Sequence, residues 1–171
     1  MTSPADFTTL FETYYPRLYS YTRSQVPTRE TAEDIVSNTF ERAFSRLETY
    51  DVAKGAFSTW IFQIARNLVR NHYAAVSRHP PQYELDEVSA GLTGSISPEE
   101  QLLFQEQRQY LLGALAILSE RDREIVQLKF FGRLTNRRIA EIMDLKEKTV
   151  SVIVLRALRK LKLHLASQEV V

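Results

Sequence analysis

The sequence predicts an all-α protein with two small helical domains joined by a flexible linker. The 171 residues include only five glycines and six prolines, so turn residues are too few for a sandwich or barrel. Apolar residues recur at spacings of three and four, as on one face of a helix. This period stops in residues 77–97, which separates an N-terminal bundle of three to four helices in residues 1–76 from a C-terminal domain in residues 98–171.

Two helices are expected at the start of the N-terminal domain. The first begins near Phe7 and ends near Val26 and Pro27. We expect the second to follow directly, with Thr31 and Asp34 forming its capping box. The apolar stripes of these helices are Phe7, Leu10, Phe11, Tyr14, Leu18 and Tyr21, followed by Ala32, Ile35, Val36, Phe40, Ala43, Phe44 and Leu47.

A third helix is predicted to begin near Phe57 or Ser58, after a segment that breaks the period around Gly55. Its two faces differ in charge. A solvated helix usually mixes signs, so a stripe that holds bases and amides but no acid favours an anionic partner. The buried stripe is Phe57, Trp60, Ile61, Ile64, Ala65 and Leu68, and the acid-free stripe is Gln63, Arg66, Asn67, Arg70 and Asn71.

Residues 77–97 are predicted to form the linker, because they contain paired prolines, two glycines and several serines. Ser97, as an N-cap before Pro98, predicts a helix that runs toward Leu118. Ser119 and Asp122 form a second predicted capping box for a helix that ends at Gly132. Two more helices are expected, over residues 135–143 and 147–165.

Several kinds of chemistry find no support in the sequence. There is no cysteine, and the three histidines are scattered, so neither a metal site nor a cofactor is expected. No paired carboxylates, nucleophile with a base, or glycine-rich phosphate loop appears, so we expect no enzyme activity. The N-terminus lacks a signal-like pattern and no apolar run approaches the ~20 residues that span a bilayer, so we expect a cytoplasmic protein without membrane insertion.

The net charge of +1 is unevenly distributed along the chain. Residues 1–76 hold eight basic and eight acidic side chains, residues 77–107 hold one and six, and residues 108–171 hold thirteen and seven. The C-terminal domain is therefore basic and the connector before it is acidic. This distribution indicates that the C-terminal domain binds a polyanion.

The segment TNRRIAEIMDLKEKTVSVIVLRALRKL, residues 135–161, has the layout of a helix-turn-helix. The small Ala140 allows two helices to approach, and Asp144 at the turn tolerates a left-handed backbone. Ile139, Leu145 and Val150 are expected to pack between the helices. The second helix of this motif enters the major groove. The residues expected at DNA are Arg137, Arg138, Lys146, Lys148, Thr149, Ser151, Val152, Arg156 and Arg159.

Three runs of the sequence together resemble one protein family. AEDIVSNTFERAF (32–44), GAFSTWIFQIARNLVRNHY (55–73) and LSERDREIVQLKFFGRLTNRRIAEIMDLKEKTVSVIVLRALRKL (118–161) resemble regions two and four of extracytoplasmic-function (ECF) sigma factors, in the same order. The resemblance implies a monomeric protein that directs RNA polymerase core enzyme to promoter DNA and starts transcription. It also implies regulation by an anti-sigma protein.

The resemblance further implies roles for particular residues. The 48–58 loop matches the element that captures a flipped base of the minus-ten element. Of its aromatic residues, Tyr50 is the better candidate for stacking on a base, because Phe57 and Trp60 fall on the buried stripe. The residues implied at polymerase are Glu33, Asp34, Asn38, Glu41 and Arg42. Those implied at the minus-ten element are Tyr50, Asp51, Lys54, Arg66, Asn67, Arg70 and Asn71.

The chain departs from the family pattern at two places. Ser37 and Asn38 replace the usual Gln-Glu pair of the polymerase-binding helix, and Ser151, Val152 and Ile153 replace a polar cluster of the recognition helix. The apolar residues of this helix cannot all face inward, so at least Val152 or Leu155 should be exposed. An exposed apolar side chain there could contact thymine methyl groups or bind another protein. We expect weak or partner-assisted reading of the minus-thirty-five element.

The alternatives to a sigma factor are a helix-turn-helix regulator that acts without polymerase and a sigma-like adaptor.

Overall fold

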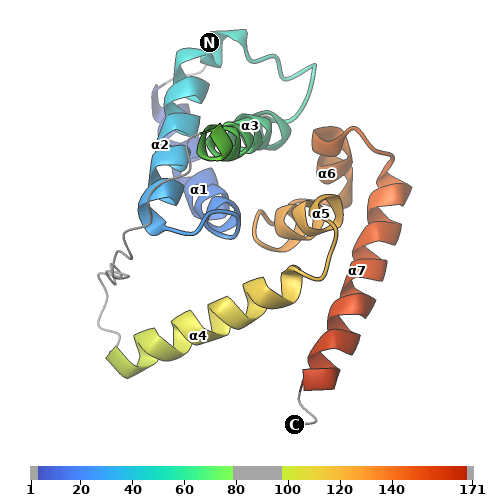
Figure 1. The fold of residues 1–171 in the computed structure, drawn as a ribbon. Coiled ribbons are helices and arrows are strands. Elements are labelled where there is room, and N and C mark those ends of the chain that lie inside the picture. Colours follow the sequence, from blue (N-terminus) through green and yellow to red (C-terminus); the bar gives the residue numbers. More distant parts are fainter. Residues whose placement is uncertain (1–3, 79–97, 169–171) are drawn as a thin grey trace.

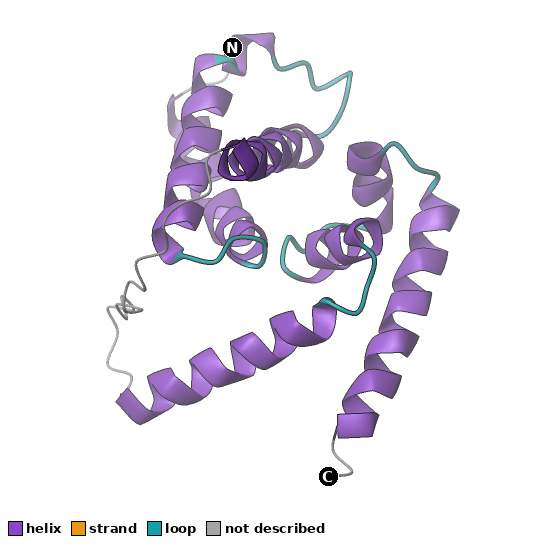
Figure 2. Cartoon of the chain, in the orientation of Figure 1, coloured by secondary structure: helices purple, strands orange, loops and turns teal. Residues whose placement is uncertain are grey.

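The computed structural model describes residues 4–78 and 98–168, which are all helix or loop in that part of the chain (Figures 1 and 2). The N-terminal domain contains α1, α2, a short 3₁₀ helix η1 and α3, and the C-terminal domain contains α4 to α7 (Figure 1). The bounds are α1 Pro4–Arg23, α2 Arg29–Ser45, η1 Leu47–Thr49, α3 Phe57–Arg78, α4 Pro98–Leu115, α5 Glu120–Phe130, α6 Asn136–Met143 and α7 Glu147–Gln168.

The predicted linker lies almost wholly outside the described residues. Residues 79–97, which include the predicted N-cap Ser97, are not described. The first two residues of the predicted linker, Ser77 and Arg78, are the last residues of α3. No helix in the described ranges is long and apolar enough to cross a membrane.

The N-terminal helices bury the face that their period predicts, with Leu18, Val36 and Ile61 fully enclosed. Two local predictions were wrong. Thr28, not Thr31, is the N-cap of α2, and its side chain accepts a hydrogen bond from the backbone N–H of Thr31. The extended backbone of Thr28 places its hydroxyl there.

The second error concerns Phe44, which was predicted to be buried but is 60% exposed. Phe44 lies near the C-terminal end of α2, where its ring packs edge-on against the ring of Phe7 at 4.9 Å between centroids. The buried polar residue on this helix is instead Thr39, whose hydroxyl donates to the carbonyl oxygen of Ile35. A hydroxyl bonded within its own helix can be buried at low cost.

The helix-turn-helix of the C-terminal domain forms as predicted. Ser119 caps α5, and Asp144 between α6 and α7 is left-handed, with φ 54° and ψ 51°. The turn after α5 differs from the prediction, because Arg133 takes the left-handed backbone (φ 51°) and Gly132 does not. A Cβ on Gly132 would lie 2.7 Å from the carbonyl oxygen of Leu128 and 2.9 Å from a ring carbon of Phe62. The glycine is therefore required for close packing.

The two domains lie in direct contact and share part of their core. One cluster of buried residues contains Leu18, Phe40 and Phe62 of the N-terminal domain together with Ile125, Leu128 and other residues of the C-terminal domain. Figure 1 shows α3 facing α5 and α6 across the middle of the molecule. Phe62 lay outside the stripe predicted for α3, yet it is fully buried. It is covered where Gly132 and its neighbours approach α3.

Candidate nucleic-acid interface

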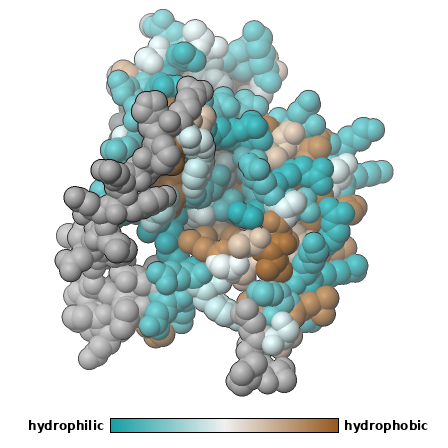
Figure 3. Space-filling model, viewed as in Figure 1, coloured by the Kyte–Doolittle hydropathy of each residue, from teal (hydrophilic) through white to brown (hydrophobic). Residues whose placement is uncertain are grey.

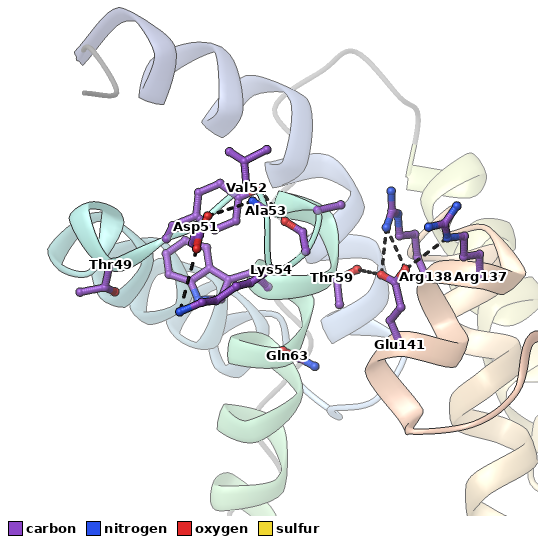
Figure 4. A pocket seen from close by; sticks show the side chains of 14 residues that line it. Thr49, Asp51, Val52, Ala53, Lys54, Thr59, Gln63, Arg137, Arg138 and Glu141 are labelled. Atoms are coloured by element: carbon purple, nitrogen blue, oxygen red, sulfur yellow. Dashed lines mark hydrogen bonds and ion pairs between the residues drawn. The ribbon is translucent and has the colours of Figure 1, made fainter.

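A cleft of about 860 Å³ lies beside the 48–58 loop (Figure 4). The N-terminal domain supplies residues 49–56 and three residues of α3. The opposite wall comes from α6, so that segments about 80 residues apart in the sequence line one space. The side chains that line it outside the loop are Thr59, Trp60, Gln63, Arg137, Arg138 and Glu141.

Tyr50 is held in place by its neighbours in the loop. Its ring stacks on Trp60, with 5.1 Å between centroids, and meets the ring of Phe57 edge-on. Its hydroxyl donates to the carbonyl oxygen of Gly55 at 3.0 Å. Partial burial raises the pKa of Tyr50, which keeps the phenol neutral. The ring is thus fixed within the cleft rather than freely exposed, as a pre-organised stacking surface requires.

The predicted residues Asp51 and Lys54 shape the same loop. The carboxylate of Asp51 accepts the backbone N–H of Ala53 at 2.9 Å, and Lys54 lies 3.9 Å from its other oxygen. The Lys54 side chain is 85% exposed, so this ion pair is weak and leaves the ammonium available to a phosphate.

The acid-free stripe of α3 is divided by its contact with the C-terminal domain. Asn67, Arg70 and Asn71 are exposed, as predicted for a strand-binding face. Arg66 is half-buried and forms a bidentate ion pair with Glu124 of α5, with bonds of 2.7 and 3.1 Å. The hydrogen bonds that Arg66 donates to Glu124 raise the pKa of Arg66. The structure therefore exposes Gln63, Asn67, Arg70 and Asn71 of this five-residue stripe and pairs Arg66.

Glu141 of α6 connects the two walls of the cleft. It accepts a hydrogen bond from the hydroxyl of Thr59 at 2.6 Å and from Arg138 at 2.9 Å, and Arg137 lies 3.5 Å away (Figure 4). Partial burial would raise the pKa of Glu141, but the hydrogen bonds and charges of these partners together lower it. Arg137 and Arg138 thus line the cleft beside Glu141.

The recognition helix α7 presents the cations that the sequence predicted. Lys146, Lys148 and Arg159 are exposed, as is Thr149. The hydroxyl of Ser151 is engaged within the protein, because it accepts from the side-chain amide of Asn136 at 2.9 Å and donates to the carbonyl oxygen of Glu147. The hydrogen bond between Asn136 and Ser151 links α6 to α7. The Ser151 hydroxyl therefore has less hydrogen-bonding capacity left for a DNA base.

The apolar residues of α7 divide as expected. Val150, Ile153 and Val154 are buried, whereas Val152 is 62% and Leu155 is 52% exposed. Figure 3 shows apolar surface next to hydrophilic surface on the face viewed. Both Val152 and Leu155 are therefore free to contact a thymine methyl group or a protein.

A second hollow of about 350 Å³ lies beside α7 and contains a residue that the sequence prediction missed. Arg121 of α5 lines it together with Lys148, Thr149 and Arg156. Asp122 lies between the two arginines, 3.1 Å from Arg156 and 3.2 Å from Arg121. The signal in the sequence that could have drawn attention to Arg121 is its basic side chain in the first turn of α5, where the helix dipole disfavours a cation.

The face of α2 predicted to meet polymerase is solvent-exposed at Asp34, Asn38, Glu41 and Arg42. Glu33 is half-buried and pairs with Arg29 at 2.6 Å. The Asn38 side chain donates to the backbone carbonyl of Asp34. In the described part of the chain, no cluster of three or more histidine, aspartate or glutamate side chains has the arrangement of a metal site.

Comparison with known families separates the chain into the same two parts. Residues 10–79 match the model for Sigma-70 region 2, and residues 114–163 match the model for Sigma-70, region 4. The first match contains the 48–58 loop, α2 and α3, and the second contains the helix-turn-helix.

Curated relatives and solved structures agree with these matches. The chain is 32% identical over 155 residues to the ECF RNA polymerase sigma factor BldN of Streptomyces coelicolor, covering 91% of this chain but 58% of that protein. It is 30% identical over 158 residues to the ECF RNA polymerase sigma-E factor of Salmonella typhimurium, covering 88% of this chain and 82% of that one.

The fold is similar to that of two proteins solved as complexes. CnrH in complex with the cytosolic domain of CnrY gives a TM-score of 0.71 at 20% identity, covering 96% of this chain and 90% of CnrH. RpoE of Bartonella quintana in complex with the anti-sigma factor NepR gives 0.67 at 22% identity, covering 94% of this chain and 97% of RpoE. The two matched regions in this order, together with the identity to the sigma-E factor, show that the chain belongs to the ECF family of RNA polymerase sigma factors.

Proposed function

We propose that this ECF sigma factor docks on RNA polymerase core enzyme through α2 and holds the opened minus-ten strand with the 48–58 loop and α3. The observation that carries the proposal is the pairing of the two features on one domain. The 48–58 loop, with its fixed Tyr50 ring, lies next to a helix face where Asn67, Arg70 and Asn71 are exposed without an acid among them.

The chemistry of this surface suits a single strand. Flipping a base out of the stack costs a few kcal/mol, and an aromatic ring that stacks on the base can offset about 1–3 kcal/mol of it. Arg70 supplies charge for the backbone, while the amides of Asn67 and Asn71 can read base edges. Tyr50 and Lys54 belong to the same surface through the loop.

The promoter duplex upstream of the minus-ten element would bind to α7. The predicted contacts are Lys146, Lys148, Thr149, Arg156 and Arg159, and Arg121 joins them from α5. Ser151 is engaged within the protein, and Val152 offers no hydrogen bond. We therefore infer that duplex binding rests mainly on phosphates and that reading of the minus-thirty-five element is weak or partner-assisted.

The proposed role requires no chemistry of the chain's own. Polymerase makes the transcript, and the sigma factor acts by binding. We propose that it works in the cytoplasm with the polymerase and that an anti-sigma protein regulates it. The anti-sigma factor NepR, solved in complex with the sigma factor RpoE of Bartonella quintana, supports the last point by analogy of fold.

The test is transcription from genomic promoters by core polymerase with and without the purified protein. We expect new transcripts that core alone does not make, and Arg70→Gln should reduce them at least tenfold without weakening core binding. Arg46→Gln is the matched control, since Arg46 is an exposed cation at the end of α2 outside the proposed surfaces. Stable operator binding without any effect on transcription would favour a regulator that acts without polymerase.

A further inference from the structure

We propose that the contact between the two domains is autoinhibitory, because Glu124 and Glu141 of the C-terminal domain occupy the strand-binding face of the N-terminal domain. In this arrangement a single DNA strand can replace Glu124 at Arg66, or Glu141 at Thr59, only after α5 and α6 move away. The proposal rests on the function proposed above and adds a means of controlling it within the chain itself.

The first contact is the ion pair between Arg66 and Glu124. Both oxygens of the carboxylate accept hydrogen bonds from the guanidinium, at 2.7 and 3.1 Å, and the side chains are 18% and 17% exposed. An arginine presents the same two-pronged geometry to a carboxylate and to a phosphate. Glu124 therefore takes the position that a backbone phosphate of the strand would take on Arg66.

The second contact joins α3 to the α6 wall of the cleft. Thr59 of α3 donates its hydroxyl to Glu141 at 2.6 Å, and Arg138 holds the same carboxylate at 2.9 Å (Figure 4). The carboxylate of Glu141 adds a negative charge to a lining that contains the cations Lys54, Arg137 and Arg138 and the acid Asp51, and so makes the cleft less favourable for an anionic strand. Arg137 and Arg138, which were predicted to meet DNA, line the same cleft.

Other contacts hold the domains together at neighbouring sites. Arg17 donates to the carbonyl oxygens of Gly132 and Arg133, both at 3.0 Å, and Gln127 donates to that of Ser24 at 2.8 Å. These donors and acceptors are not among the residues proposed to bind the strand. Replacing the two glutamates should therefore weaken closure while leaving the strand-binding residues and both cores intact.

The effect on DNA binding follows from the population of the open form. When only the open fraction binds, the apparent dissociation constant is the intrinsic constant divided by that fraction. Glu124→Gln exchanges a charged for a neutral acceptor of Arg66 across the interface, and Glu141→Gln does the same for the hydroxyl of Thr59, which weakens both hydrogen bonds. Two such exchanges should raise the open fraction, and hence the affinity, by roughly tenfold.

The first experiment compares two variants of the full-length protein that carry the same charge. Glu124→Gln with Glu141→Gln removes the interdomain acids. The control, Glu120→Gln with Glu147→Gln, removes two exposed acids of the same domain that lie at the starts of α5 and α7. The probe is a fluorescent single-stranded DNA of random sequence, roughly 20 nucleotides long and thus longer than the footprint of one binding domain.

We expect the interdomain variant to bind the probe about tenfold more tightly than the wild type, and the control variant less than twofold more tightly. Equal gains in the two variants would show a general effect of charge and would overturn the proposal. Thermal melting of each variant checks that both domains remain folded.

A second measurement reads closure directly and does not depend on DNA. The chain has no cysteine, so Ser45→Cys and Ser167→Cys provide two unique labelling sites on exposed positions, one in each domain. Energy transfer between the labels should fall in the interdomain variant and stay unchanged in the control. Unchanged transfer in both variants would overturn the proposal.

Binding to core polymerase is assayed separately with the same proteins. If the chain fails to bind core, the proposed function is lost, whereas the label distances still report the interdomain contact. If core binding and transcription occur but the interdomain variant behaves like the control, autoinhibition alone is refuted.

Discussion

Individual side chains at the ends of helices show where the sequence pattern was sufficient. Asp144 takes the left-handed backbone that its place in the helix-turn-helix predicted. At the end of α5 the same conformation falls on Arg133, because Gly132 is needed where a Cβ would meet Leu128 and Phe62. One glycine cannot serve both positions, so the arginine adopts the less favourable backbone.

The backbone of Arg133 leads to a stability prediction. Arg133→Gly should raise the free energy of unfolding by about 0.5–1 kcal/mol, since glycine adopts this conformation without a steric penalty. Arg133→Ala is the control, because it removes the same side chain and keeps the penalty. Urea unfolding measures both, and equal stability of the two variants would contradict the explanation from backbone strain.

Glu141 should make stability depend on pH. Its pKa in the folded protein lies below the ordinary value for a glutamate, so its contribution is present above that ordinary value and is lost as the pH falls through the folded pKa. The difference in stability between wild type and Glu141→Gln should therefore be largest at neutral pH and vanish in acid once the pH is below the folded pKa of Glu141. Denaturant unfolding across this range checks it, and a difference that persists in acid would contradict the assigned cause.

At the scale of elements, the start of α2 shows how similar residues compete for one role. Thr28 and Thr31 are both suitable caps, and their hydroxyls lie 2.8 Å apart. The backbone decides between them, because only a residue with extended geometry at the helix start can receive the N–H three residues later. A sequence with two candidate threonines does not reveal which one lies outside the helix.

Two matched substitutions distinguish the caps. Thr28→Val should lower the free energy of unfolding by about 1 kcal/mol, because the N–H of Thr31 loses its acceptor. Thr31→Val removes the other hydroxyl and should cost less than about 0.5 kcal/mol, in line with an exposed helical position. Thermal unfolding gives both values. A larger loss of stability in Thr31→Val than in Thr28→Val would show that Thr31 is the N-cap.

At the scale of the whole molecule, α3 serves both domains. One face carries the core of the N-terminal bundle, and Phe62 on another face is buried where the C-terminal domain approaches. This places Arg66, one turn further along the helix, against Glu124. The burial of Phe62 and the ion pair between Arg66 and Glu124 are thus parts of the same contact between the two domains.

Phe62 should therefore be required for closure as well as for stability. Phe62→Ala should lower the free energy of unfolding by about 3–4 kcal/mol and increase the separation of labels at positions 45 and 167. Phe44→Ala is the control, since that ring is 60% exposed, and it should cost less than about 1 kcal/mol. Unfolding followed by Trp60 fluorescence gives the energies. A folded Phe62→Ala protein with an unchanged label separation would show that the ring does not hold the domains together.

The sequence by itself determined the helices, their core stripes and the exposed basic residues of α3 and α7. These features depend on periods and caps within a few turns of chain, where neighbouring residues fix the geometry. Leu18, Ile61, Ser119 and Asp144 illustrate this, and the ordered motifs were sufficient to indicate the ECF family.

Only the tertiary structure decided how the two domains meet. The burial of Phe62, the pairing of Arg66 with Glu124 and the bond from Thr59 to Glu141 join residues 58 or more positions apart. A helical period identifies the face of a helix that packs within its own domain. It does not show which other face of the same helix is covered by a neighbouring domain. That choice depends on the shape and charge of both surfaces together, which exist only after each domain has folded.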